Sequence, residues 1–217
     1  MWVNELGGLT FRFDGIEPAQ YVKWAPNHPE LDLEGEARRL RWARSYAPVP
    51  VVIDVGADDE GSWLSMIALP GESAVSPRWL REPRTAARAI GTGLRTLHDR
   101  LPVSECPFSW SLETRFAWIK RPEDRTLVTD APSVDHLVVC HGDACAPNTL
   151  LDNHGNFLAV VDCGRLGVGD RWADLAVATY SLAWNYDGTW DDELLDAYGI
   201  ERDPERIDYY RRLWDAT

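Results

Sequence analysis

The first 70 residues alternate between short apolar runs and polar turns. The Asp14-Gly15 pair and Pro18 separate the first two runs, a pattern that is typical of a hairpin. A longer run spaces Ala37, Leu40 and Ala43 three residues apart, which predicts a helix. The expected order is strand, strand, helix, strand, strand, over residues 9–13, 20–24, 34–46, 51–55 and 63–69.

After Pro70-Gly71 the pattern becomes mainly helical. An apolar stripe at helical spacing runs through residues 84–100. Asp203 and Pro204 are residue types favoured at the N-cap and first position of a helix, so the last helix is expected to begin there. Other helices are expected over residues 110–119, 172–184 and 191–198, strands over 137–140, near 150 and over 157–161, and a loop over 122–132. The pattern predicts a small β-rich lobe, residues 1–70, and a larger helical lobe, residues 71–217, with a hinge near Leu69.

The acidic composition narrows the classes of partner. A net charge of −13 argues against nucleic-acid binding, which needs a basic surface. An acidic cleft would concentrate a cationic small molecule, although acidity also serves solubility alone. The N-terminus lacks a basic segment followed by an apolar run, and no stretch approaches the roughly 18 apolar residues of a membrane span. We therefore expect no membrane association and a cytoplasmic location.

The most informative stretch is His141-Gly-Asp143-Ala-Cys-Ala-Pro-Asn148, which lies between two expected strands. Asp162 follows fourteen residues after Asn148, at the end of another expected strand and before Gly164. Phosphoryl transfer to an alcohol needs a carboxylate that orients the hydroxyl, and oxygen ligands that hold magnesium against the nucleotide phosphates. Asp143 is the candidate carboxylate, and Asn148 and Asp162 are candidate magnesium ligands. Gly164 is expected to let the backbone turn sharply beside the metal.

Each of these residues alone has a simpler interpretation. A lone loop aspartate is usually a turn former or a cap, and a lone histidine such as His141 is more often structural. His141 and Asp143 also form an H-x-D pair that can bind a metal, but no further His or Cys lies at ligand spacing. The joint pattern of HGDxxxxN followed by DxG is much less expected by chance, and it favours kinase chemistry.

A basic and an acidic residue in the first lobe fit the same chemistry. Lys23 lies in an expected strand, and Glu36 lies thirteen residues later in the first turn of an expected helix. A strand lysine paired with a helix glutamate is the kinase arrangement that steadies the α- and β-phosphates. The simpler interpretation is a strand-edge lysine and a glutamate favoured by the helix dipole. Because the HGDxxxxN and DxG motifs are present in the large lobe, we favour the functional interpretation of Lys23 and Glu36.

At these residues the chain resembles the aminoglycoside phosphotransferases, most closely the 3′-phosphotransferases. Residues 35–40, 69–71, 137–148 and 161–176 carry much of the likeness. The resemblance implies an α+β, protein-kinase-like fold with a small antiparallel β-rich N-terminal lobe and a larger, mainly helical C-terminal lobe. It also implies ATP or GTP as the donor and Mg²⁺ ions. Asp143 would be the base-like residue, Asn148 and Asp162 the metal ligands, and Lys23 with Glu36 the phosphate pair.

The resemblance assigns roles to five further residues. The backbone near Ala68 and Leu69 would meet the purine edge of the nucleotide. Arg165 would lie beside the transferring phosphate or the acceptor and take part in catalysis. Asp170 and Asp174 look like structural acids, whose carboxylates can bond backbone N–H groups.

Four features depart from the family pattern. Little chain precedes Gly7-Gly8-Leu9, where the family has a further strand, so either the start of the chain is misassigned or the small lobe is truncated and lacks that strand. The segment between Cys106 and His141 is shorter than the region that carries an acidic substrate loop in the drug-modifying enzymes. Tyr180 stands where those enzymes often have an arginine, and Trp184-Asn185 where they often have adjacent acids. The kinase chemistry is expected to be intact, while the positions that recognise the acceptor are altered.

The expected activity is ATP-dependent O-phosphorylation of a small, cationic alcohol by a monomeric or dimeric enzyme. An aminoglycoside 3′-hydroxyl is the first acceptor to consider, in the context of antibiotic resistance. One alternative is a kinase of the same fold that acts on another alcohol, such as an amino alcohol, a sugar or another antibiotic. A non-enzyme alternative, motivated by the expected loss of the first strand, is a pseudokinase that binds nucleotide and transfers no phosphate.

Overall fold

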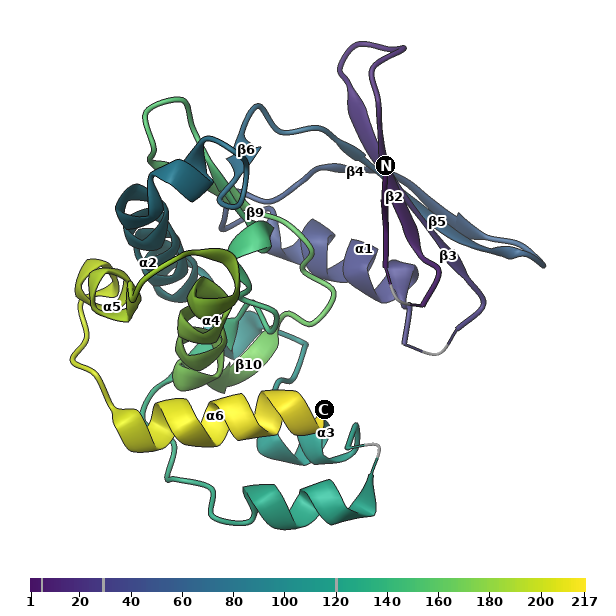
Figure 1. Cartoon of the computed structure of the whole chain (residues 1–217). Coiled ribbons are helices and arrows are strands. Elements are labelled where there is room, and N and C mark those ends of the chain that lie inside the picture. The colour runs from purple at the N-terminus through teal and green to yellow at the C-terminus, as the bar shows by residue number, and fades with distance from the viewer. Residues whose placement is uncertain (5, 29, 120) are drawn as a thin grey trace.

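The computed structural model describes residues 1–4, 6–28, 30–119 and 121–217 (Figure 1). The first part of the chain forms a five-stranded antiparallel sheet in the order β1-β2-β3-β5-β4. Helix α1 packs against β4 and β5 of this sheet, on the side that faces the rest of the chain (Figure 1). The elements are β1 (Trp2–Val3), β2 (Leu9–Phe13), β3 (Gln20–Pro26), α1 (Leu33–Ala43), β4 (Val52–Ala57) and β5 (Gly61–Ile67).

The short strand β1 corrects one expectation from the sequence. Trp2–Val3 pairs with β2, so the small lobe does contain a strand before Gly7. A two-residue strand is too short to show an alternating pattern, which is why periodicity did not reveal it. The turn that follows is closed by Asn4, whose Oδ1 accepts a hydrogen bond from the Gly8 N–H at 2.6 Å, and by Gly7, which has a φ of 84°.

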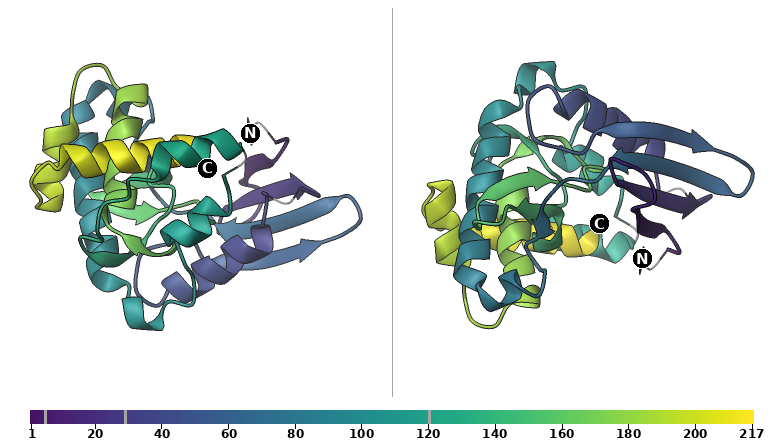
Figure 2. Two further views of the ribbon diagram at one scale, coloured as in Figure 1. Left: turned by 90° about the horizontal axis from the view of Figure 1, so that it is seen from below. Right: turned by 90° about the horizontal axis from the view of Figure 1, so that it is seen from above.

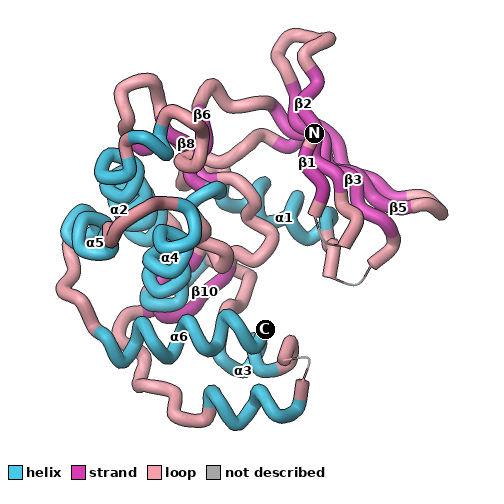
Figure 3. The backbone as a smooth tube through the Cα atoms, in the orientation of Figure 1, coloured by secondary structure: helices cyan, strands magenta, loops and turns pink. Residues whose placement is uncertain are grey.

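The rest of the chain is mainly helical, as the sequence predicts, and the five-stranded sheet projects from one side of it (Figures 2 and 3). Two small antiparallel sheets, β10-β7 and β6-β8-β9, lie within this part. Its helices are α2 (Pro83–Arg100), α3 (Leu112–Phe116), α4 (Trp172–Asn185), α5 (Asp191–Tyr198) and α6 (Pro204–Ala216), with 3₁₀ turns η1 (Trp79–Arg81), η2 (Val103–Glu105), η3 (Pro122–Val128) and η4 (Ala146–Asn148). Its strands are β6 (Glu72–Ser73), β7 (Leu137–Cys140), β8 (Thr149–Leu151), β9 (Phe157–Val160) and β10 (Gly167–Asp170).

Strand β10 and helix α3 differ from the sequence prediction for a shared reason. The helix expected over 110–119 is limited to α3. Trp110 lies outside it because its N–H donates to the carbonyl of Val168, in β10, at 2.8 Å. A Cβ at Gly167 would lie 2.6 Å from the backbone carbon of Ser109, so glycine permits this close approach. Strand propensity does not favour glycine, and β10 was therefore missed.

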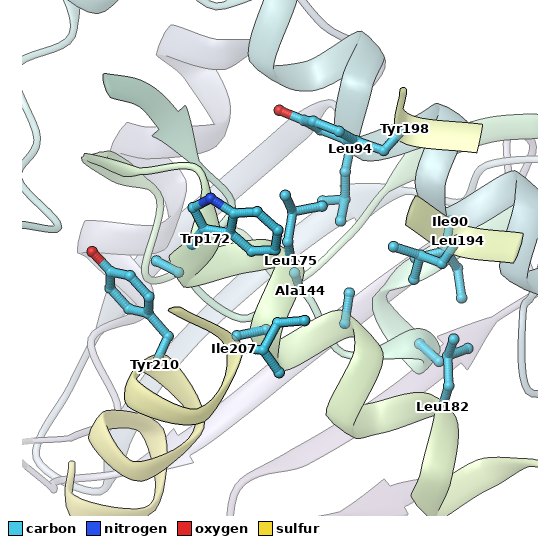
Figure 4. Close-up of a cluster of buried hydrophobic side chains, with 14 of the residues drawn as sticks. Ile90, Leu94, Ala144, Trp172, Leu175, Leu182, Leu194, Tyr198, Ile207 and Tyr210 are labelled. Atoms are coloured by element: carbon cyan, nitrogen blue, oxygen red, sulfur yellow. The ribbon is translucent and has the colours of Figure 1, made fainter. Parts of the chain in front are cut away.

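Two clusters of buried apolar side chains hold the molecule together. The first lies among the helices of the large lobe, and its members include Ile90, Leu94, Trp172, Leu175 and Leu182 (Figure 4). The second runs from the five-stranded sheet and α1 into the helical part, and its members include Leu40, Leu64, Leu97, Val139 and Val160. The boundary predicted at residues 70 and 71 falls between β5 and β6, which belong to different sheets, and the two-lobe division stays a prediction. Within the described ranges, no helix is both long enough and apolar enough to cross a membrane.

Candidate active site

Lys23 lies at the centre of an ion cluster that joins three segments of the chain. Its Nζ donates to Oε1 and Oε2 of Glu36 at 2.7 and 2.9 Å, and to Oδ1 of Asp162 at 2.9 Å. Glu36 is in the first turn of α1, and the N-cap of this helix is Asp32, whose carboxylate accepts from the Gly35 N–H at 2.7 Å. The structure thus brings together the lysine and glutamate singled out in the sequence, and adds Asp162 to them.

Burial separates the roles that the two carboxylates can play. Burial by itself would lower the pKa of Lys23, but Glu36 and Asp162 raise it above its ordinary value, so the ammonium is charged at neutral pH. The Lys23 charge lowers the pKa of Asp162, whereas burial raises the pKa of Glu36. The Glu36 side chain is 5% exposed and that of Asp162 is 44% exposed. Glu36 is therefore an internal anchor for Lys23, and Asp162 is the carboxylate that a ligand can reach.

The backbone turn beside Asp162 is made by Asp162 itself. Its φ is 61°, the one positive value for a non-glycine residue in the described ranges. The chain does turn at Gly164, as expected, because the Leu166 N–H donates to the Cys163 carbonyl at 3.1 Å, but this turn does not require glycine: Gly164 is not among the glycines with positive φ, and a Cβ there would meet nothing closer than 3.8 Å. Aspartate tolerates the left-handed region better than most residues, and such backbone strain is concentrated at functional sites.

A buried carboxylate fixes the backbone of the loop that carries Asp143. Oδ2 of Asp174, on α4, accepts from the His141 N–H at 2.6 Å, and its Oδ1 accepts from the Gly142 N–H at 2.9 Å. The Asp170 carboxylate likewise accepts from the N–H groups of Trp172 and Asp135. The expectation that Asp170 and Asp174 are structural acids is therefore confirmed by these contacts.

His141 and Asn148 orient the backbone around Asp143. Nε2 of His141 lies 2.8 Å from the Val161 carbonyl oxygen, and its Nδ1 accepts from the Asp143 N–H at 3.2 Å. These contacts give His141 a structural position. Nδ2 of Asn148 donates to the Asp143 carbonyl at 2.9 Å, and the described residues offer no hydrogen bond to the amide oxygen of Asn148. Oδ1 of Asp143 is buried and has no partner among the described residues, and a buried acceptor of this kind suits a ligand hydroxyl.

A cavity of about 490 Å³ connects Lys23 with Asp143. Its charged lining is mostly acidic and comprises Glu30, Asp32, Glu36, Asp143 and Asp162 against Lys23, Arg39 and Arg165. Ala68 and Leu69 lie outside this lining, and the Ala68 N–H donates to the Ala19 carbonyl at 2.8 Å. The structure does not bring these two residues to the cavity, and their contact with a purine stays a prediction.

Arg165 is stacked on aromatic rings at one end of this cavity. Its guanidinium carbon lies 5.2 Å from the centroid of Trp118 and 5.7 Å from that of Trp214, within the range of cation–π attraction. The buried Arg115 lies 4.9 Å from the same Trp118 ring. Sequence reasoning singled out Arg165 but missed Trp118 and Arg115, because tryptophan and arginine in a short helical segment carry no functional signal of their own.

Asn148 and Asp162 are suited to a hard divalent cation. They offer one amide oxygen and one partly exposed carboxylate, and magnesium prefers oxygen ligands while keeping several waters. Among the described residues there is no group of three or more His, Cys, Asp or Glu side chains that could hold a metal ion. A metal here would therefore depend on nucleotide oxygens as well, and the assignment stays a prediction.

Sequence comparison places the chain among known phosphotransferases. Residues 19–210 match the phosphotransferase enzyme family. An aminoglycoside 3′-phosphotransferase of Streptomyces fradiae is 36% identical over 249 aligned positions, which cover 97% of this chain and 92% of that protein. A streptomycin 3″-kinase of Streptomyces griseus is 32% identical, over 99% of this chain and 90% of that protein. Because 249 aligned positions exceed the 217 residues of the chain, the Streptomyces fradiae protein carries segments that this chain lacks.

Solved structures extend the similarity to the whole fold. An aminoglycoside-3′-phosphotransferase of type VIII superposes with a TM-score of 0.84 at 29% identity, over 100% of this chain and 92% of that one. An aminoglycoside phosphotransferase of Streptomyces rimosus, solved in complex with ADP and streptomycin, superposes with a TM-score of 0.72 at 28% identity, over 91% and 86% of the two chains. The expected protein-kinase-like α+β fold is confirmed.

Proposed function

Because the chain belongs to the phosphotransferase enzyme family, we propose that it transfers the γ-phosphoryl group of ATP to a hydroxyl group of an aminoglycoside. The 3′-hydroxyl is the first acceptor to test, since the relatives include aminoglycoside 3′-phosphotransferases. The observation that carries the proposal is the ion cluster of Lys23, Glu36 and Asp162, which shares one cavity with Asp143.

The donor end of the proposed site is formed by Lys23 and its partners. The Lys23 ammonium, held by Glu36, would contact the α- and β-phosphates of the nucleotide. Asn148 and Asp162 would hold Mg²⁺, which when bound neutralises charge on the β- and γ-phosphate oxygens. The relative that was solved with ADP supports the use of a nucleotide by this fold.

The acceptor end is formed by Asp143 and Arg165. The acceptor oxygen would form a bond to the γ-phosphorus as the bond to the β–γ bridging oxygen breaks, so that ADP leaves. Oδ1 of Asp143, which has no partner within the described chain, would orient the hydroxyl and take its proton. Arg165, stacked on Trp118, would place a positive charge beside the phosphate as it transfers.

The charge of the cavity supports a cationic acceptor. Five acidic side chains face three basic ones in its lining, and the whole chain carries a net charge of −13. A cleft of one dominant sign raises the local concentration of ligands of the opposite sign. Aminoglycosides carry several amino groups and fit this field.

A kinase for another small alcohol is the second candidate. Tyr180 and Trp184 stand where the resemblance leads us to expect an arginine and acids, and their ring centroids lie 4.4 Å apart. Trp184 is exposed, so this pair presents an aromatic surface on α4, although neither residue lines the cavity that contains Asp143. The pseudokinase alternative loses its motivation, because β1 supplies the strand that was expected to be absent.

The test uses the purified chain with Mg²⁺, labelled ATP and a panel of alcohols. We expect label on an aminoglycoside that has a 3′-hydroxyl, and none on its matched 3′-deoxy analogue. Asp143→Asn should abolish transfer while nucleotide binding remains, and Asp208→Asn, on the exposed face of α6, is the control that should behave as wild type. Label on a different alcohol and on no aminoglycoside would favour the second candidate, and nucleotide binding without any transfer would favour the pseudokinase.

A further inference from the structure

A buried chain of hydrogen bonds runs from α5 to the loop that carries Asp143. The Tyr198 hydroxyl lies 2.9 Å from Nδ1 of His98, on α2, and Nε2 of His98 lies 3.0 Å from Oδ2 of Asp174, on α4. The same carboxylate accepts from the N–H groups of His141 and Gly142, the two residues that precede Asp143. All three side chains are buried, so water does not compete for these bonds.

The hydrogen bonds of this network have a consistent donor-to-acceptor order from Tyr198 to Asp174. The Asp174 carboxylate accepts from both backbone amides, so the proton between it and His98 belongs to Nε2 of the imidazole. In a neutral imidazole Nδ1 is then an acceptor. Burial raises the pKa of Tyr198 to about 12, so its hydroxyl stays protonated and, with His98 neutral, donates a hydrogen bond to Nδ1. Tyr198 therefore orients His98, and His98 orients Asp174.

The meeting of Tyr198 with His98 depends on the close approach of α2 and α5. A Cβ at Gly91 would collide with the backbone carbonyl of Leu194 and lie 3.1 Å from Cβ of Ala197. Glycine at this position lets the two helices pack closely, and the His98 and Tyr198 rings meet at a centroid distance of 5.6 Å and an interplanar angle of 73°. The network is thus built into the packing of the helices.

We infer that His98 and Tyr198 are positioning residues for the phosphoryl transfer proposed above. They fix the rotation of the Asp174 carboxylate, which aligns one oxygen with each of the His141 and Gly142 amides and so sets the place of Asp143. The inference rests on the proposed function of Asp143. Neither His98 nor Tyr198 lines the cavity, so their loss should lower kcat and leave KM nearly unchanged.

The alternative is that this network only stabilises the fold. The matched control is Tyr209→Phe on α6, which removes a buried hydroxyl bonded at 3.2 Å to the Val128 carbonyl, away from the Asp143 loop. Tyr198→Phe and Tyr209→Phe each delete one oxygen and keep the ring. If the network only stabilised the fold, both variants would lose thermal stability, and both would keep the wild-type kcat.

The kinetic test compares Tyr198→Phe, His98→Leu and His98→Gln in the full chain. A misplaced catalytic group costs up to about 100-fold in rate, so we expect kcat to fall about 10-fold in Tyr198→Phe and about 100-fold in His98→Leu. KM values for ATP and acceptor should stay within about twofold of wild type. His98→Gln, whose amide can still donate and accept, should recover part of the rate, and Tyr209→Phe should keep the wild-type kcat. Unchanged kcat in both Tyr198→Phe and a folded His98→Leu would overturn the inference.

A second measurement does not depend on turnover. The amide proton resonances of His141 and Gly142 report their hydrogen bonds to Asp174, and they should shift in Tyr198→Phe and stay in place in Tyr209→Phe. If Tyr198→Phe leaves them unmoved, the inference fails even when the wild-type enzyme is active. If the wild-type chain transfers no phosphate to any alcohol, the proposed function fails, and these resonances still show whether Tyr198 controls the loop.

Discussion

The Nζ atom of Lys23 lies 2.9 Å from Oδ1 of Asp162, although 139 residues separate them along the chain. The same nitrogen bonds both oxygens of Glu36. One cation therefore connects the sheet, α1 and the segment after β9, and its charge serves both the fold and the proposed phosphate site.

Replacing that cation should damage activity and stability together. Lys23→Met keeps the length of the side chain and leaves the buried Glu36 carboxylate without its counter-charge. We expect a loss of stability of about 3 kcal/mol in urea unfolding. We also expect kcat/KM for ATP to fall by at least about 100-fold in steady-state kinetics. Arg12→Met, which removes an exposed cation of β2, should change neither quantity, and wild-type kcat/KM in Lys23→Met would contradict the assignment.

Asp174 should show its contribution through the pH dependence of stability. Burial by itself would raise its pKa, but His98 and the Gly142 N–H are among the groups that lower it below the ordinary value. A carboxyl with a lowered folded-state pKa stabilises fully above its unfolded pKa of about 3.9, and loses this contribution as the pH falls through the folded pKa. Asp174→Asn should therefore cost about 3 kcal/mol at pH 7, and less below about pH 3.9. Urea unfolding of both proteins across this range is the measurement, and a difference that does not shrink in acid would contradict it.

Gly142 should not tolerate a side chain. Its φ is 82°, and a Cβ there would collide with the backbone carbonyl of Arg165. Gly142→Ala is expected to lose at least about 1 kcal/mol of stability and most of the activity, because the loop that carries Asp143 must shift. Gly199→Ala is the control that has the backbone strain without the steric collision. Gly199 has a φ of 86°, and a Cβ added there would meet nothing within 4 Å. It should lose about 1 kcal/mol and keep its kcat; equal kcat in both variants would refute the prediction.

Trp118 should affect the acceptor more than the nucleotide. Its ring is stacked with Arg165, which lines the cavity beside Asp143. Cation–π contacts of this kind contribute about 0.5–2 kcal/mol, so Trp118→Leu should lower kcat/KM for the acceptor by roughly 3- to 30-fold. KM for ATP should stay within about twofold, and Trp190→Leu, at the N-cap of α5 and outside the cavity lining, should leave both values unchanged. A larger effect on the ATP KM than on the acceptor would place Trp118 elsewhere in the mechanism.

Local patterns were enough to predict some of these features and not others. Asp143, Asn148 and Asp162 stand in short motifs beside strands, and their joint pattern predicts a role in phosphoryl transfer that stays a prediction. The stacking of Arg165 on Trp118 and the bond between His98 and Tyr198 depend on how distant helices pack, and no local pattern encodes that packing. Strand β10 was missed for the opposite reason, because its glycines serve a close backbone approach that propensity counts against.

The second apolar cluster has a consequence for folding. Leu40 and Leu64 from the first part of the chain share one buried core with Leu97, Val139 and Val160 from the second. Separating the parts would uncover apolar surface on both, and each large side chain so exposed costs about 1.5–3 kcal/mol. We therefore expect the sheet and the helical part to unfold as one cooperative unit, with no separate transition for the sheet.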